Sequence, residues 1–114
     1  METRHRLLSY VHVPAFDETA EGLLDDDDIR HVQLILNEDP HAGVVVPGTG
    51  GLRKLRIPAS GRGKRGGGRL IYFYVEVRFR IYLMAVFPKN EYGDISPAGY
   101  RALKELAKRL RKEP

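Results

Sequence analysis

The spacing of apolar residues along the chain predicts an alternation of strands and helices. Runs rich in β-branched and aromatic residues predict strands over residues 7–13, 44–46, 52–57, 69–76 and 80–87. Apolar residues three or four positions apart predict helices over residues 14–24 and 25–37. A third helix is expected from Ser96-Pro97, a capping residue followed by proline. This order, with no internal repeat, predicts one domain that spans residues 1–114.

Four consecutive acids, residues 25–28, precede the second helix. Their carboxylates are expected to cap free N–H groups and to complement the positive end of the helix dipole. A metal cluster is the alternative, but four adjacent acids point in different directions and match no calcium-loop spacing. Behind them Ile29, Val32 and Leu36 form the expected buried stripe. The sequence therefore favours a helix start at these acids.

Charge is distributed unevenly along the chain. Residues 1–40 carry ten acids against three bases, whereas residues 41–114 carry five acids against sixteen bases. The two parts therefore have net charges of −7 and +11. This asymmetry favours a surface for nucleic acid or another polyanion on the second part, with a solvated basic face as the alternative.

Several classes of protein are disfavoured by what the sequence lacks. The chain contains no cysteine, which excludes disulfides and thiolate chemistry, and its four histidines are scattered without ligand spacing. No apolar run approaches the roughly 20 residues of a membrane span. The first residues also lack the apolar core of a signal peptide. We therefore expect a cytoplasmic protein without a metal or other cofactor.

The densest positive charge lies in residues 53–69, which hold seven Lys or Arg residues and no acid. Side chains alternate between the two faces of a strand, so Lys54 and Arg56 in the predicted strand 52–57 lie side by side on one face. The glycine-rich segment 60–68 that follows has the backbone freedom of a flexible loop. This stretch predicts a binding site for a polyanion.

Basic residues alone are enough for one reaction, the cleavage of RNA by its own 2′-hydroxyl. That reaction needs a proton acceptor, a proton donor and cations around the phosphate. A lysine crowded by other cations loses its proton more easily, so Lys54 or Lys89 is expected to act as base or acid. Arg56 and Arg69 stay protonated and are expected to clamp the phosphate. The alternative is a purely electrostatic RNA-binding strand without catalysis.

Five segments of the chain together resemble one protein family. They are PGTGGLRKLR, the glycine-broken basic loop, RLIYFYV, RIYLMAVFPKN and the final Ser-Pro helix. Their order and spacing are similar to those of the HigB-type branch of the RelE superfamily of bacterial toxins, over nearly the whole chain. The resemblance implies an α+β fold with a twisted, mainly antiparallel sheet, two N-terminal helices and a C-terminal helix. It also implies a metal-independent endoribonuclease that cuts translated mRNA in the ribosomal A site, and a cognate antitoxin.

The resemblance also assigns roles to individual residues. It places Lys54 and Arg56 at a pair of basic catalytic residues and Arg69 at an arginine that stabilises the phosphate. Lys89 falls at a further basic position near the end of the last strand. The expected RNA-binding residues are Arg53, Arg62, Lys64, Arg65 and Asn90. The family's tyrosine after the last strand is not matched in position by Tyr92, which favours Lys54 as the proton-transfer group.

Two other functions are compatible with the sequence: a non-catalytic RNA- or ribosome-binding module and a DNA-binding repressor. A repressor normally inserts a helix into the major groove, whereas the densest positive charge here lies on a strand and a glycine loop. The expected partners are the ribosome, mRNA and an antitoxin with a helix-turn-helix domain. Acidic segments of such an antitoxin would complement the basic part of the chain.

Overall fold

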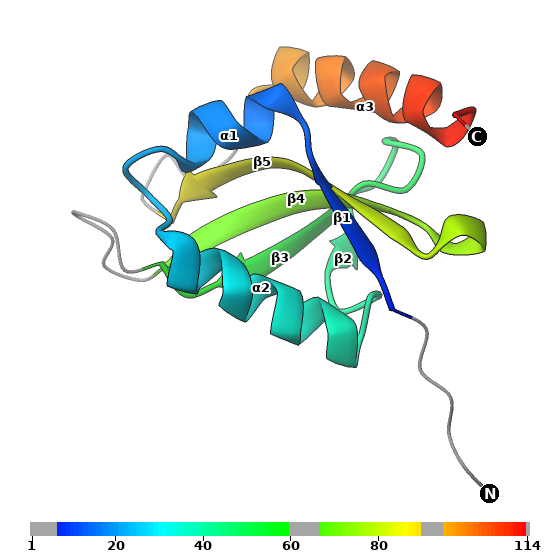
Figure 1. Ribbon diagram of the computed structural model, residues 1–114. Helices are drawn as coiled ribbons and strands as arrows, with labels where there is room; N and C mark the ends of the chain where they lie inside the picture. Colours follow the sequence, from blue (N-terminus) through cyan, green and yellow to red (C-terminus); the bar gives the residue numbers. More distant parts are fainter. Residues whose placement is uncertain (1–6, 60–66, 90–94, 114) are drawn as a thin grey trace, which may run out of the picture.

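The computed structural model describes residues 7–59, 67–89 and 95–113, which form five strands and three α-helices (Figure 1). In chain order the elements are β1 (Ser9–His12), α1 (Pro14–Ala20), α2 (Asp26–Glu38), β2 (Val44–Val45), β3 (Arg53–Ile57), β4 (Gly68–Val75), β5 (Arg80–Pro88) and α3 (Pro97–Arg111). A short 3-10 turn, Glu76–Arg78, joins β4 to β5. Each helix and strand predicted from the sequence is present with its ends shifted by a few residues. That residues 1–114 form a single domain stays a prediction.

The strands form one sheet in the order β1-β5-β4-β3-β2. Strands β2, β3, β4 and β5 pair antiparallel in succession, and only β1 pairs parallel, with β5. β1 lies at an edge and is followed closely by Pro14, a residue that cannot donate to a β-ladder. The fold is therefore α+β with a mainly antiparallel sheet, which confirms the expectation.

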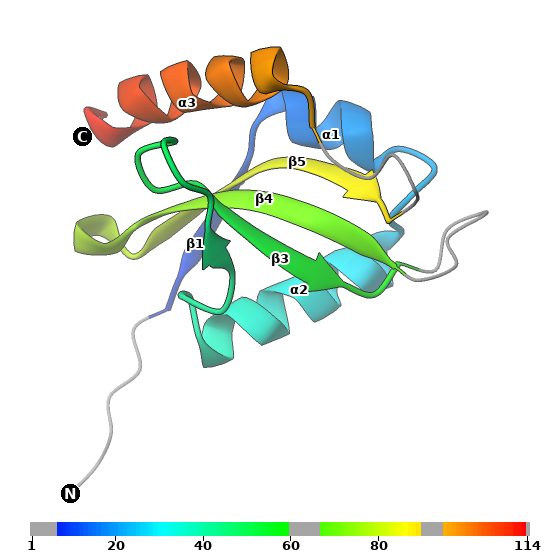
Figure 2. The ribbon, with the colours of Figure 1, turned by 180° about the vertical axis from the view of Figure 1, so that it is seen from behind.

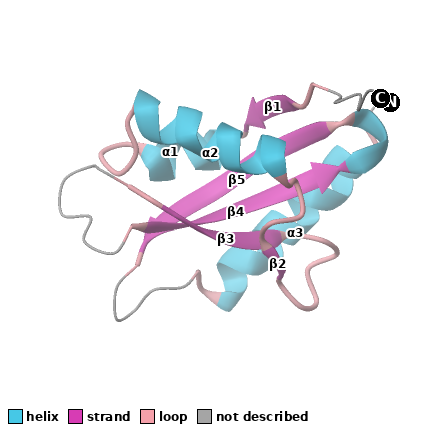
Figure 3. Ribbon diagram, turned by 90° about the horizontal axis from the view of Figure 1, so that it is seen from below, coloured by secondary structure: helices cyan, strands magenta, loops and turns pink. Residues whose placement is uncertain are grey.

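The sheet lies between helices. α2 covers one face and α3 the opposite face, as the two opposed views show (Figures 1 and 2). The view from below, onto the face of the sheet, shows the twist of the long strands β4 and β5 (Figure 3). Every side chain of residues 81–86 is buried, as expected for a strand that is apolar on both faces. None of the helices in the described ranges is long and apolar enough to cross a membrane.

The acids before α2 form a helix cap. A carboxylate oxygen of Asp25 accepts from the backbone N–H of Asp28 at 2.8 Å, and the Asp28 carboxylate accepts from the Asp25 N–H at 3.0 Å. In α3, Ser96 Oγ accepts from the backbone N–H of Gly99 at 3.0 Å. Both predicted helix starts are thus confirmed. Across the described residues, no group of three His, Asp or Glu side chains is placed to hold a metal ion.

Two tyrosine hydroxyls, one half-buried and one on a fully buried residue, attach α2 and the chain that follows it to the sheet. The Tyr10 hydroxyl donates to Asn37 Oδ1 at 2.6 Å. The Tyr72 hydroxyl donates to the Pro40 carbonyl at 2.8 Å and accepts from the Gly43 N–H at 2.9 Å. Burial raises the pKa of both hydroxyls, that of Tyr10 to about 12. These hydrogen bonds fix where α2 ends and where β2 begins.

Replacing Tyr72 by phenylalanine should lower the free energy of unfolding by about 1–3 kcal/mol, because the buried Gly43 N–H loses its acceptor. Tyr74→Phe is the matched control, since Tyr74 is on the same strand and its hydroxyl forms no hydrogen bond with a described residue. Its effect should stay within about 0.5 kcal/mol. Urea unfolding of both variants measures the difference, and equal losses would contradict an anchoring role for the Tyr72 hydroxyl.

Candidate functional site

A hollow of about 360 Å³ brings together Lys54, Arg56 and Arg69. We call it the basic hollow. Its other lining residues are apolar: Val44, Val45, Val46 and Pro47. Lys54 and Arg56 line it together, so the prediction that they lie side by side on one face of β3 is confirmed. Arg69 joins them from β4.

The pairing of β3 with β4 places Arg56 directly opposite Arg69. Like charges in that position are unfavourable for a sheet. Within the described part of the chain neither arginine forms an ion pair with a carboxylate, and no acidic residue lines the basic hollow. A bound anion between the two guanidinium groups would relieve this repulsion, so the geometry is suited to phosphate.

Two residues of the apolar wall, Val46 and Pro47, belong to a loop that spans residues 46–51 and that we call the wall loop. The buried Thr49 donates its hydroxyl to the Val46 carbonyl at 2.6 Å. At the far end of α3, the Arg111 guanidinium donates to the Gly50 carbonyl. The wall loop is therefore fixed both internally and to α3.

Lys89, the fourth predicted catalytic residue, follows β5 and does not line the basic hollow. Its side chain is exposed, and its backbone N–H donates to the Gly67 carbonyl at 3.2 Å. Gly67 has φ +76°, and a Cβ there would collide with the Ile57 carbonyl oxygen, so this close approach requires glycine. Lys89 thus lies beside the start of β4, close to the strand position of Arg69. Of the predicted RNA-binding residues, Arg62, Lys64, Arg65 and Asn90 lie outside the described residues.

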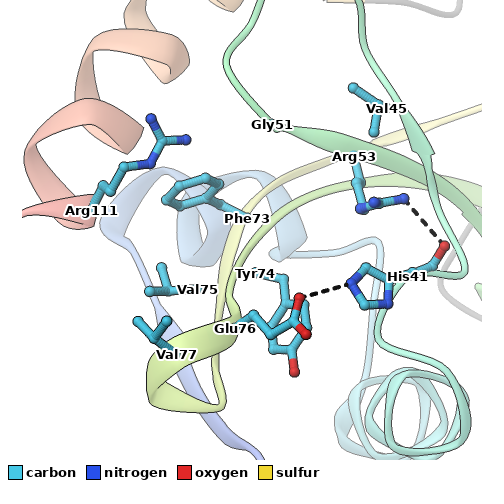
Figure 4. Close-up of a pocket in the computed structure, with 10 residues that line it drawn as sticks. All are labelled: His41, Val45, Gly51, Arg53, Phe73, Tyr74, Val75, Glu76, Val77 and Arg111. Atoms are coloured by element: carbon cyan, nitrogen blue, oxygen red, sulfur yellow. Dashed lines mark hydrogen bonds and ion pairs between the residues drawn. The ribbon is translucent and has the colours of Figure 1, made fainter.

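Arg53 lies in a different hollow, of about 380 Å³, at the edge of the sheet where β4 extends past β3 (Figure 4). Its guanidinium donates to the Gly43 carbonyl at 2.6 Å and to the His41 carbonyl at 3.2 Å. Glu76 lies in the same hollow and pairs with His41 at 3.4 Å. The structure therefore gives Arg53 a role in holding the chain between α2 and β2. Its predicted binding to RNA stays a prediction.

A protein-family model matches residues 43–113, the part of the chain that holds β2 to α3 and all the predicted catalytic residues. Its description is the RelE toxin of the RelE / RelB toxin-antitoxin system. The chain belongs to the RelE toxin family. This RelE-family protein is therefore a toxin of a toxin-antitoxin system, its family implies an antitoxin partner, and toxins of the family are generally endoribonucleases that cleave mRNA. Its place in the HigB-type branch stays a prediction.

The apolar wall of this RelE-family site was not predicted from the sequence. The valines of residues 44–46 were assigned only to a short strand. In the structure Val44 is 75% exposed and Val45 44% exposed, so these side chains contribute little to the core. The sequence signal for this surface is the run of β-branched residues shortly before the basic strand, but only the structure shows that these side chains face solvent.

Proposed function

We propose that this RelE-family toxin is a ribosome-dependent endoribonuclease that cuts translated mRNA in the A site without a metal ion. The basic hollow is the observation that supports this function most strongly. Lys54, Arg56 and Arg69 meet there on one surface, and none of the described residues that line it is acidic. Three cations, two of them at directly opposite positions of neighbouring strands, suit a phosphodiester that gains negative charge during cleavage.

In the proposed reaction the RNA supplies its own nucleophile. The 2′-oxygen attacks the adjacent phosphorus, the bond from phosphorus to the 5′-oxygen breaks, and the products carry a 2′,3′-cyclic phosphate and a 5′-hydroxyl. Lys54 exchanges a proton with one of these two oxygens, and Lys89 is the candidate for the other. Arg56 and Arg69 bind the non-bridging oxygens, on which charge accumulates in the transition state.

The proposed dependence on the ribosome follows from the lack, among the described residues of the basic hollow, of a group that would orient the RNA for attack. The hollow contains cations and an apolar wall, and its described lining residues include no carboxylate or imidazole that would orient the 2′-hydroxyl. A ribosome that holds mRNA in the reactive geometry would supply this alignment, which in general removes up to about 7–11 kcal/mol of a barrier. On this proposal the toxin completes a site that the ribosome has already partly arranged.

We also propose that the toxin belongs to the HigB-type branch and acts in the cytoplasm, where translating ribosomes are found. Its antitoxin is expected to carry a helix-turn-helix domain and acidic segments that cover the basic part of the chain. A non-catalytic RNA- or ribosome-binding module is the second candidate function. The same hollow supports it, because cations without an aligned base are sufficient for binding.

Brief expression of the chain without its antitoxin should stop growth and create new mRNA 5′ ends inside translated codons. The physical reason is that cleavage on translating ribosomes depletes intact mRNA. Mapping mRNA ends before and after induction measures this, and the new ends should disappear when initiation of translation is blocked. Unimpaired growth at confirmed soluble expression would count against both candidates. Arrest without new ends would favour the binding module.

A further inference from the structure

A further hollow, of about 280 Å³, lies between the wall loop and the first half of α3. We call it the helix groove. Its basic residues are Arg101 and Lys104, and Tyr100 belongs to its lining. It shares Val46 and Pro47 with the basic hollow. The two hollows therefore lie on the two sides of one ridge of apolar surface.

The structure of α3 explains why the helix groove is basic. The helix buries Leu103, Ala107 and Leu110, which leaves Arg101 and Lys104, three positions apart, on a neighbouring face. Arg101 is exposed and Lys104 is half-buried. No acidic residue lines the groove in the described part of the chain. Two basic residues in a groove whose described lining includes no acid favour an anionic ligand, and the nearby Glu105 pairs with Lys108 instead.

One strand of RNA would be able to occupy both hollows. A phosphate held by Arg56 and Arg69 lies beside Val46 and Pro47, and the surface beyond that ridge belongs to the helix groove. Single-stranded RNA is commonly bound in this way, with cations along its backbone and apolar or aromatic surface against its sugars and bases. The hydrogen bonds within the wall loop and from Arg111 hold the ridge in place, so the crossing point is preformed.

We propose that the helix groove is a second RNA-binding subsite, in which Arg101 and Lys104 hold the backbone of the mRNA strand next to the phosphate that is cleaved. The inference rests on the proposed function, since the same strand must enter the basic hollow. Ribosomal RNA carries the same phosphates. Val46 and Pro47 line both hollows, so an mRNA strand that leaves the basic hollow emerges beside the helix groove. This favours the cleaved mRNA strand over ribosomal RNA as the occupant of the groove.

The test uses the variant Arg101→Gln/Lys104→Gln and the matched control Lys108→Gln/Arg109→Gln. The control removes the same charge from exposed positions of the same helix outside the groove, where Lys108 pairs with Glu105 at 3.6 Å. Affinity is measured for a dinucleotide, for a single-stranded RNA long enough to span both hollows, and for ribosomes, at several salt concentrations. Unchanged thermal unfolding confirms that both variants fold.

The groove variant should bind the long RNA roughly tenfold more weakly at low salt. Its affinity should also depend less on salt: the negative slope of log affinity against log salt should become shallower by about 0.7 for each phosphate that the variant no longer neutralises. Its affinity for the dinucleotide should match that of the unmodified chain, and the control variant should keep its affinity for both RNAs. Equal decreases of affinity in the two variants would show a general charge effect and overturn the subsite. An unchanged affinity for the long RNA would also overturn it.

A groove variant that loses affinity for ribosomes but not for the long RNA would assign the groove to ribosomal RNA and overturn the proposal. These outcomes are distinct from failure of the proposed function. Cleavage that survives the change Lys54→Ala would contradict the proposed chemistry, yet it would leave a length-dependent binding difference in place. If Lys54→Ala abolishes cleavage and the groove variant binds like the unmodified chain, only the subsite is wrong.

Discussion

Replacing Lys54 by arginine should lower the rate of mRNA cleavage on the ribosome by about 10²-fold or more, the usual loss when a proton-transfer group is removed. Arginine keeps the positive charge in the basic hollow but does not give up its proton. The variant should therefore still bind ribosomes and should fail at the chemical step. Lys54→Ala loses both charge and proton transfer and should be at least as inactive. Single-turnover cleavage on programmed ribosomes measures both rates.

Lys108→Arg is the matched control for this experiment. Lys108 is an exposed lysine on α3 that lines neither the basic hollow nor the helix groove, so the rate should not change. A Lys54→Arg variant that cleaves at the unmodified rate would exclude proton transfer by Lys54 and leave it a purely electrostatic role. A loss of ribosome binding in parallel with cleavage would instead place the defect before the chemical step.

The parts of the fold that the sequence predicts well are those determined by short stretches of chain. The acid cap of α2 closes between Asp25 and Asp28, three residues apart, and the cap of α3 closes between Ser96 and Gly99. Period-two alternation likewise placed Lys54 and Arg56 together without any knowledge of their neighbours. Each of these inferences needed only local geometry.

The parts that the sequence did not predict depend on interactions between distant residues. Tyr72 forms hydrogen bonds with the backbone at Pro40 and Gly43, about thirty positions away in the chain. The Arg53 guanidinium also donates to this segment between α2 and β2, at the Gly43 carbonyl. The cation that completes the basic hollow, Arg69, is set opposite Arg56 by strand register rather than by any local pattern. The chemistry of the basic stretch and the family resemblance both indicated Arg69 as a phosphate clamp, but periodicity alone could not place it opposite Arg56.

Replacing Arg69 by alanine should lower the cleavage rate by about 10²–10³-fold, the usual loss when one group that stabilises transition-state charge is removed. The same change should leave the fold intact. Arg69 faces Arg56 across the sheet, so alanine relieves a like-charge repulsion, and the free energy of unfolding should stay the same or rise by up to about 1 kcal/mol. Cleavage assays and urea unfolding on the same preparations test both parts.

Arg78→Ala is the matched control for Arg69→Ala, because Arg78 is also a half-buried arginine but lies in the turn at the other end of β4, where it donates to the Arg111 carbonyl at 3.1 Å. It should keep the unmodified cleavage rate. Arg69→Lys should recover only part of the activity, since lysine lacks the planar pair of donors that binds two phosphate oxygens. If Arg69→Ala instead destabilised the fold and cleavage fell only in proportion to the folded fraction, Arg69 would be a structural residue and the phosphate clamp would be wrong.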